Sequence, residues 1–485
     1  MLSIKNQNLL RTNGLINGQW IAADSKKTFA VINPFNGEKI ADIPEMGHDE
    51  TVRAIEAAHK AFSSWRDMTA GDRYPIFSRW SKLVSDNLND LAMILTSEQG
   101  KPIAQAKFEL QLVSDRILFY AEEARRIHGQ VLPSVGPGKN TIVIRQPYGV
   151  IAGVSPWNFP ASTANEKMTP AIAAGNTMVF KPAQDTPLTA LALGYLAQEA
   201  GMPNGVINIV TADNPKAIGD TLTTHPLVRK FTFTGSTAIG KILYAQCAST
   251  VKKVALELGG NAPFIVFDDA DIDFALETAV PLKYTNCGQV CINPNRFLIQ
   301  ETIFDQFVER FTEKAKQLVL GSGLDPKTDV GPMINSKGLE KVEILIADAL
   351  QKGAKVLTGG KRKDSTSLFF TPTVITNMNS SMRMYHEEVF GPVAAFYKFK
   401  TESDALAMAN DTEYGLAAYC FTNDLGRSWR MCTVLEYGLV SINAGRPFGD
   451  GPYGGHKQSG IGHEGGRVAA LDEYCEIKTI AMAGL

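Results

Sequence analysis

The chain has 485 residues, which is too long for one hydrophobic core and predicts two or three domains. Its 48 basic and 50 acidic residues nearly cancel and form no run of like charge, so we do not expect nucleic acid as a partner. No apolar stretch approaches about 18 residues, and the six cysteines and seven histidines show no metal-ligand spacing, so we expect a cytoplasmic protein without a membrane span or a metal site.

The first third of the chain predicts turns and short strands followed by helices. Apolar residues fall at helical spacing over residues 49–65 and again over 70–97. A β-branched segment at residues 141–147 then predicts a strand with an apolar edge that needs a partner. That partner is either the alternating segment at residues 474–482 or a second subunit.

Short apolar strands alternate with helices between residues 148 and 260, and a second alternating unit extends from 262 to 440. This alternation is typical of parallel doubly wound sheets, whose ligands bind beyond the carboxyl ends of the strands. We expect strands at 149–154, 177–182, 206–210, 230–234, 262–267, 296–300, 354–357 and 417–421, and helices at 189–201, 214–225, 304–320 and 336–352.

Residues 284–296, YTNCGQVCINPNR, form a Gly- and Gln-containing loop between a helix-like and a strand-like segment. Exposed backbone N–H groups in such a loop favour negative charge, and a thiol becomes a strong nucleophile as the thiolate. Cys291 is therefore the candidate nucleophile, although a single cysteine is more often a small buried apolar residue.

Other polar side chains follow the predicted strands. Asn158, in PWNFP, lies in a proline-flanked loop where its amide can face a developing oxyanion. Gly235 and Ser236 open a helix whose first N–H groups can approach a phosphate, although a Gly-Ser turn also has an ordinary structural explanation. Glu257 precedes two glycines, and Glu388 lies in EEVFGP.

Taken together, PWNFP, FTGST, LELGG, GQVC and EEVFGP resemble the aldehyde dehydrogenase superfamily, over nearly the whole chain. The resemblance implies an α/β protein with two doubly wound parallel-sheet domains and a small β oligomerisation domain. The nicotinamide-binding domain would comprise residues 1–127 and 148–256, and the catalytic domain residues 257–440 with a returning loop at 441–468. The oligomerisation strands would lie in 128–147 and 469–485.

The same resemblance implies the site residues. Cys291 is the nucleophile, Glu257 the general base, and Asn158 the side-chain half of an oxyanion hole that the Cys291 N–H completes. Glu257 also favours a free carboxylic acid as the product, because it activates the water that hydrolyses the thioester. The cofactor contacts would be made by Trp157, Lys181, Gln184, Gly235, Ser236, Glu388 and Phe390.

The sequence as a whole most resembles the succinate-semialdehyde dehydrogenase group. Two arginines that bind the substrate carboxylate in that group are replaced here by Glu166 and Thr285. A dicarboxylic semialdehyde would need another cation, and Arg446 and Lys457 are candidates. A neutral, aromatic or cationic amino aldehyde is the alternative substrate. Glu166 also has a purely structural explanation, which is an ion pair with Arg446. Phe159, Phe448 and Tyr453 are expected to wall the pocket.

Gln184 stands where relatives that prefer NAD often carry a glutamate, so we expect use of both NAD and NADP or a preference for NADP. The unpaired strands favour a homodimer or a homotetramer.

A structural protein on the same fold without turnover remains the alternative from another functional class, since fold alone does not establish activity. Its expected mark is loss of Cys291 or Glu257, and both are present.

Overall fold

A computed structural model describes residues 2–445, 451–465 and 468–484. Its largest sheet has eight strands, and the five central ones are parallel. The order across this sheet is β2 (Gln19–Ile21), β1 (Gly14–Ile16), β9 (Ile207–Ile209), β8 (Thr177–Lys181), β7 (Val150–Val154), β10 (Val228–Thr234), β11 (Lys253–Glu257) and β21 (Gly460–Ile461).

The strand order reverses between β7 and β10. From β7 the chain proceeds through β8 to β9 on one side, then returns to place β10 and β11 on the other side. The loops after β7 and β10 therefore diverge and leave a crevice at the carboxyl ends of the strands, where ligands bind in open α/β sheets. The PWNFP loop and the Thr234–Gly235–Ser236 turn occupy these two positions.

The second sheet has seven strands and a separate apolar core. All neighbours are parallel except β14 and β15. The order is β14 (Lys355–Thr358), β15 (Thr373–Thr376), β16 (Val393–Phe399), β13 (Pro294–Gln300), β12 (Ala262–Val266), β18 (Ala417–Phe421) and β19 (Leu439–Ile442). The predicted α/β class with two largely parallel sheets is confirmed.

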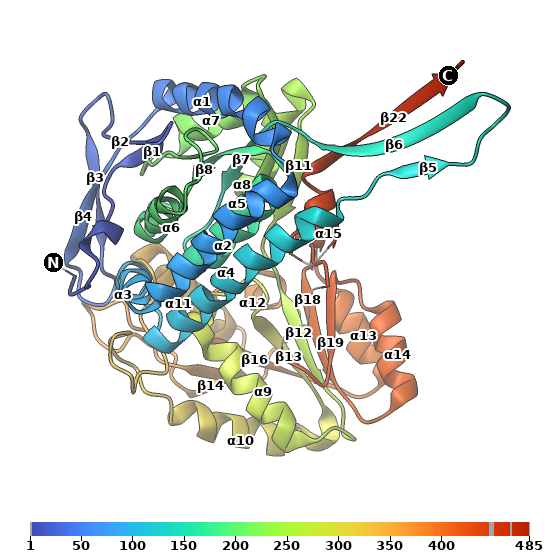
Figure 1. Cartoon of the computed structure of the whole chain (residues 1–485). Helices are drawn as coiled ribbons and strands as arrows, with labels where there is room; N and C mark the ends of the chain where they lie inside the picture. The colour runs from blue at the N-terminus through green and yellow to red at the C-terminus, as the bar shows by residue number, and fades with distance from the viewer. Residues whose placement is uncertain (1, 446–450, 466–467, 485) are drawn as a thin grey trace.

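A third sheet forms an arm that projects from the body of the protein (Figure 1). It contains β5 (Gln130–Leu132), β6 (Lys139–Pro147) and β22 (Cys475–Ala483). β22 pairs antiparallel with all of β6, from Cys475 opposite Pro147 to Ala483 opposite Lys139. The predicted partner for the 141–147 strand is thus the C-terminal strand of the same chain.

Helices cover the two large sheets (Figure 1). They are α1 (His48–Asp67), α2 (Ala70–Asp86), α3 (Leu88–Gln99), α4 (Ile103–Glu123), α5 (Pro160–Ala173), α6 (Pro187–Glu199), α7 (Lys216–Thr224), α8 (Thr237–Cys247), α9 (Ile272–Tyr284), α10 (Phe304–Lys316), α11 (Ser336–Gln351), α12 (Arg383–His386), α13 (Glu402–Asn410), α14 (Leu425–Val434) and α15 (Val468–Asp472). The remaining strands are β3 (Thr28–Ile32), β4 (Lys39–Pro44), β17 (Tyr414–Gly415) and β20 (His456–Lys457). Among the described residues, no helix combines the length and apolar character needed to cross a membrane.

Candidate active site

The predicted nucleophile loop follows α9 and makes a tight left-handed turn. Asn286, Cys287 and Gly288 have φ values of 51°, 56° and 73°. A side chain at Gly288 would meet the Gly391 carbonyl oxygen 2.1 Å from its Cβ, so this position requires glycine. Asn286 stabilises the turn, because its N–H donates to Gln105 Oε1 at 3.0 Å and its side-chain amide donates to the Gln289 carbonyl at 3.2 Å.

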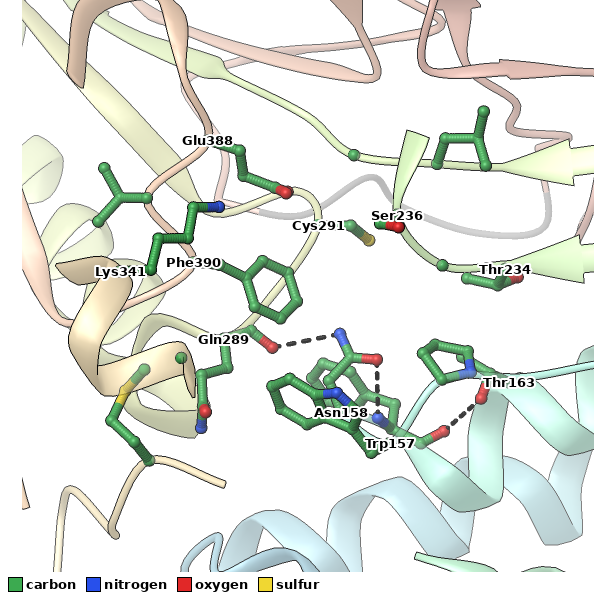
Figure 2. Close-up of a pocket in the computed structure, with 18 residues that line it drawn as sticks. Trp157, Asn158, Thr163, Thr234, Ser236, Gln289, Cys291, Lys341, Glu388 and Phe390 are labelled. Atoms are coloured by element: carbon green, nitrogen blue, oxygen red, sulfur yellow. Dashed lines mark hydrogen bonds between the residues drawn. The ribbon is translucent and has the colours of Figure 1, made fainter. Parts of the chain in front are cut away.

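The oxyanion candidate Asn158 lies opposite this turn, in the loop between β7 and α5. Its Nδ2 donates to the Gln289 carbonyl at 3.2 Å (Figure 2). The Asn158 backbone carbonyl accepts the Asn286 side-chain amide at 2.9 Å. The side chain is almost fully buried. These bonds connect the loop after β7 directly to the loop that carries Cys291.

Both loops line one cavity of about 260 Å³. The cavity brings together most of the predicted catalytic and cofactor residues, which come from both large sheets (Figure 2). The predicted residues that line it are Trp157, Asn158, Phe159, Gly235, Ser236, Cys291, Glu388 and Phe390.

Cys291 is half-buried in this cavity. Burial, followed by the Glu388 and Glu257 carboxylates, raises the pKa of its thiol to about 12, against the opposing effect of the Ile292 and Cys291 backbone N–H groups. The thiol is therefore protonated at neutral pH in the free protein. A nearby positive charge or a base is needed to form the thiolate that attacks a carbonyl.

Glu257 ends β11 and is buried. Burial raises its pKa well above the usual range, the neighbouring Glu464 carboxylate raises the pKa further, and the Lys167 ammonium opposes this effect. Among the described residues, its Oε1 has no hydrogen-bond partner. A buried carboxylate with a raised pKa and an unused oxygen has the properties expected of a general base.

Next to Glu257, Lys167 and Glu464 form a buried ion pair that the sequence analysis missed. Thr232 Oγ1 donates to Glu464 Oε1 at 2.7 Å. Lys167 follows Glu166 directly on α5, whereas Glu464 lies far away in the sequence. No local pattern indicates that the two side chains meet.

The cofactor side of the cavity has the features that a nicotinamide dinucleotide requires. Ser236 caps α8, accepting the Ile239 N–H at 3.4 Å, and it leaves the helix N-terminus facing the cavity. Glu388 Oε1 accepts the Gly260 N–H at 3.0 Å, and burial raises the Glu388 pKa to about 7. Trp157 and Phe390 meet edge to face, with ring centroids 5.6 Å apart.

Lys181 and Gln184 do not line this cavity. Lys181 ends β8 beside the PWNFP loop, where its carbonyl accepts the Ser155 N–H at 3.2 Å. Burial lowers the pKa of its ammonium to about 8. Gln184 follows in the next turn and is half-buried. Both residues lie where the chain leaves the sheet, outside the region of the nucleophile.

A second cavity, of about 260 Å³, lies between α4, α5 and Thr285, and we call it the α4–α5 cavity. Its lining is largely apolar, and Phe159 lines both this cavity and the one that contains Cys291. The lining residues are Ala104, Gln105, Phe108, Glu109, Leu112, Phe159, Ser162 and Thr285.

Glu166 lies one helical turn after Ser162, and Arg116 one turn after Leu112, so both lie on the helix faces that line this cavity, although neither is itself a lining residue. They form an ion pair in which Glu166 is mostly buried and Arg116 is partly exposed. The Tyr453 hydroxyl donates to the other oxygen of Glu166. The charge of Glu166 is therefore paired, but its partner is Arg116, which the sequence analysis did not consider.

The two cations expected to bind a substrate carboxylate are Arg446 and Lys457. Arg446 and Phe448 lie outside the described residues. The Lys457 ammonium is already engaged, because it pairs with Glu436 and donates to the Asn410 carbonyl at 3.0 Å and the Thr412 carbonyl at 3.2 Å. It stabilises the short β17–β20 sheet and lines neither cavity.

Known proteins with similar sequences and structures include aldehyde dehydrogenases. The profile of the aldehyde dehydrogenase family covers residues 20–480. The chain belongs to this family. It is 47% identical to a 3-sulfolactaldehyde dehydrogenase of Pseudomonas putida over 100% of both chains, and 47% identical to an NADP(+) succinate-semialdehyde dehydrogenase of Escherichia coli over 98% of this chain and 99% of that one. A betaine aldehyde dehydrogenase of Staphylococcus aureus, solved with NAD+, is similar with a TM-score of 0.95 and 36% identity over 98% of this chain and 95% of that one.

The protein is therefore an NAD(P)-dependent aldehyde dehydrogenase, similar to the succinate-semialdehyde dehydrogenases, and it uses NAD or NADP. The resemblance deduced from the sequence motifs is confirmed. The alternative of a structural protein without turnover has no support from these relatives, which are named as dehydrogenases.

Proposed function

We propose that Cys291, Glu257 and Asn158 carry out the oxidation of an aldehyde to its carboxylic acid. The observation that supports this assignment is the cavity shared by Asn158 and Cys291, which lie on two loops joined by hydrogen bonds. Glu257 does not line this cavity, but its buried carboxylate is near enough to raise the Cys291 pKa, and its Oε1 has no hydrogen-bond partner among the described residues. The cavity also contains the α8 N-terminus and Glu388, so the residues present fit a nicotinamide dinucleotide.

The steps follow from this geometry. Cys291 sulfur bonds to the aldehyde carbon after its proton is lost to a base, and the carbonyl oxygen becomes an oxyanion that receives N–H donors from Asn158 and the Cys291 backbone. A nicotinamide dinucleotide held at the α8 N-terminus and by Glu388 would supply the hydride acceptor that turns the thiohemiacetal into a thioester. Glu257 then takes a proton from a water molecule that attacks the resulting thioester, and the carbon–sulfur bond breaks to release the acid.

We propose that the substrate enters through the α4–α5 cavity, past Phe159, and that its far end lies near Arg116 and Glu166. Because these two charges are paired with each other, the groove favours a polar group without net charge over an anion. A semialdehyde with a terminal carboxylate is the second candidate. It is supported by the name of one relative, a succinate-semialdehyde dehydrogenase, and by the partly exposed Arg116. A second relative is named for 3-sulfolactaldehyde, in which the far end carries a sulfonate anion in place of the carboxylate.

The test is reduction of NAD and of NADP, followed by absorbance, with a panel of succinate semialdehyde, a simple aliphatic aldehyde, benzaldehyde and an aminoaldehyde. We expect the neutral or cationic aldehydes to give the higher kcat/KM. A preference for succinate semialdehyde of about a hundredfold, or about 3 kcal/mol, would show instead that Arg116 binds the substrate carboxylate.

We also propose that the protein is a homo-oligomer of the cytoplasm, with the domain boundaries expected from the sequence. The arm exposes apolar side chains, with Val131 and Ile477 exposed to 76% and 68%, which supports burial against another copy. The six cysteines are all free thiols, which supports a reducing compartment. Light scattering after size exclusion distinguishes monomer, dimer and tetramer.

A further inference from the structure

The structure contains a buried ion pair next to the oxyanion loop that the chemistry above does not use. Lys101 follows the end of α3, and Glu109 lies on α4. Their side chains are 0% and 2% exposed, and Lys101 Nζ lies 2.6 Å from Glu109 Oε2. Burying two charges is costly, so a fold that needs only a filled core at this position would do as well with apolar residues.

Each end of the pair contacts the loop that carries Asn158. Lys101 Nζ donates to the Asn158 carbonyl at 2.8 Å and lies 3.9 Å from the centroid of the Phe159 ring. Glu109 Oε1 accepts the N–H groups of Ala161 and Ser162, at 2.9 and 3.0 Å, in the first turn of α5. The Lys101–Glu109 pair therefore contacts the Asn158 loop on both sides of its proline at position 160.

The Asn158 carbonyl has a second donor, the Asn286 amide, at 2.9 Å. Asn286 belongs to the turn that positions Cys291, so the Asn158 carbonyl joins the ion pair to the nucleophile loop. Fixing this carbonyl and the following ring restricts the backbone dihedrals around Asn158. The direction of the Asn158 side-chain N–H donor depends on those dihedrals.

We propose that the Lys101–Glu109 pair is a positioning device that sets the Asn158 amide at the oxyanion. The inference rests on the role proposed above for Asn158. Lys101 and Glu109 act through Asn158 and are not themselves catalytic residues. Without the pair, the Asn158 side-chain N–H can move away from the oxyanion. A displacement of about 1 Å at such a site lowers the reaction rate by up to about a hundredfold.

The test is a double-mutant cycle between the pair and Asn158. Lys101→Met and Glu109→Gln are combined, since removing both charges avoids a single unpaired buried charge. We expect this double variant to lower kcat and the rate of the first turnover by about tenfold or more, with an unchanged dissociation constant for NAD or NADP. In the Asn158→Ala background, the same two substitutions should cost less than about threefold.

A purely structural pair would lower the rate by the same factor in both backgrounds, and that result overturns the proposal. If Asn158→Ala itself leaves the rate unchanged, the oxyanion assignment fails and the positioning role fails with it. If only the coupling is absent, the assignment of Asn158 stands and the inference alone is wrong.

A matched control is the pair of Arg427 and Asp269, which are 2.8 Å apart and line neither cavity. Arg427→Met with Asp269→Asn should change the melting temperature but show no coupling to Asn158. If the Lys101→Met/Glu109→Gln variant does not fold, Lys101→Gln combined with Glu109→Gln, which removes both charges but fills the space with polar side chains, is taken through the same cycle and should show coupling of the same sign.

Discussion

The two cavities of this protein differ in how their polar groups are held. Around Cys291, buried side-chain amides from two loops donate to backbone carbonyls of the same two loops, and the charged residues come from several elements. In the α4–α5 cavity the lining is mostly apolar, and its one charged lining residue among those described is Glu109, which pairs with Lys101. The Arg116–Glu166 ion pair lies on the same two helix faces one turn further along. The hydrogen-bonded groups around Cys291 are suited to one fixed reaction. We expect one or two substitutions at the α4–α5 cavity to change which aldehyde the protein prefers.

The strongest test of the first cavity is removal of its nucleophile. We expect Cys291→Ala to reduce kcat toward the roughly millionfold loss typical of a missing nucleophile, because no thioester can form. Steady-state reduction of NAD or NADP measures the effect. The control is Cys432→Ala, an exposed thiol on α14 that should leave kcat unchanged. Measurable turnover in Cys291→Ala would mean that another group attacks the aldehyde.

Replacement of Glu257 separates the two halves of the reaction. Glu257→Gln should still reduce about one cofactor per active site in a rapid burst, and should then slow by about a hundredfold or more because the thioester is not hydrolysed. Stopped-flow absorbance measures the burst, and mass spectrometry detects the acyl group on Cys291. A variant without a burst would assign Glu257 to the first step instead.

The groove between α4 and α5 should respond to a change of charge at Glu166. Glu166→Arg should raise kcat/KM for succinate semialdehyde by about tenfold or more, because a cation replaces a carboxylate near the substrate's far end. The same variant should not improve a simple aliphatic aldehyde. Glu166→Gln, which releases Arg116 without adding a charge, serves as the matched control and should give a smaller gain. Equal changes for both aldehydes would place the substrate elsewhere.

The smallest expected effect is a shift of the pH profile. Deprotonated Glu257 is the base, so hydrolysis of the thioester is lost as pH falls through its raised pKa. Glu464→Gln removes a carboxylate that raises this pKa, so the acidic limb of kcat should move to lower pH. Lys167→Met removes the opposing cation, so the limb should move to higher pH. Shifts in the same direction for both variants would contradict this account.

Most residues that line the Cys291 cavity could be named from the sequence as candidates, because each lies in a short motif beside a strand or a helix. Asn158 and Ser236 reach this cavity because they follow β7 and β10, whose carboxyl ends lie where the strand order reverses, whereas Cys291 enters it from the loop between α9 and β13 of the second sheet. The substrate end was not predictable in the same way. Arg116 carries no signal on an amphipathic helix until Glu166 of another helix is found beside it.

The family and the α/β class could be deduced from the sequence, and so could a candidate nucleophile and the alternative substrates, because these depend on local patterns and short motifs in the chain. Only the tertiary structure decided which charges meet. Lys101 with Glu109, Lys167 with Glu464, and Arg116 with Glu166 are brought together by the packing of α4 and α5 against each other and against the returning C-terminal segment. Charge pairing in a folded chain depends on distance in space, and neither composition nor periodicity encodes that distance.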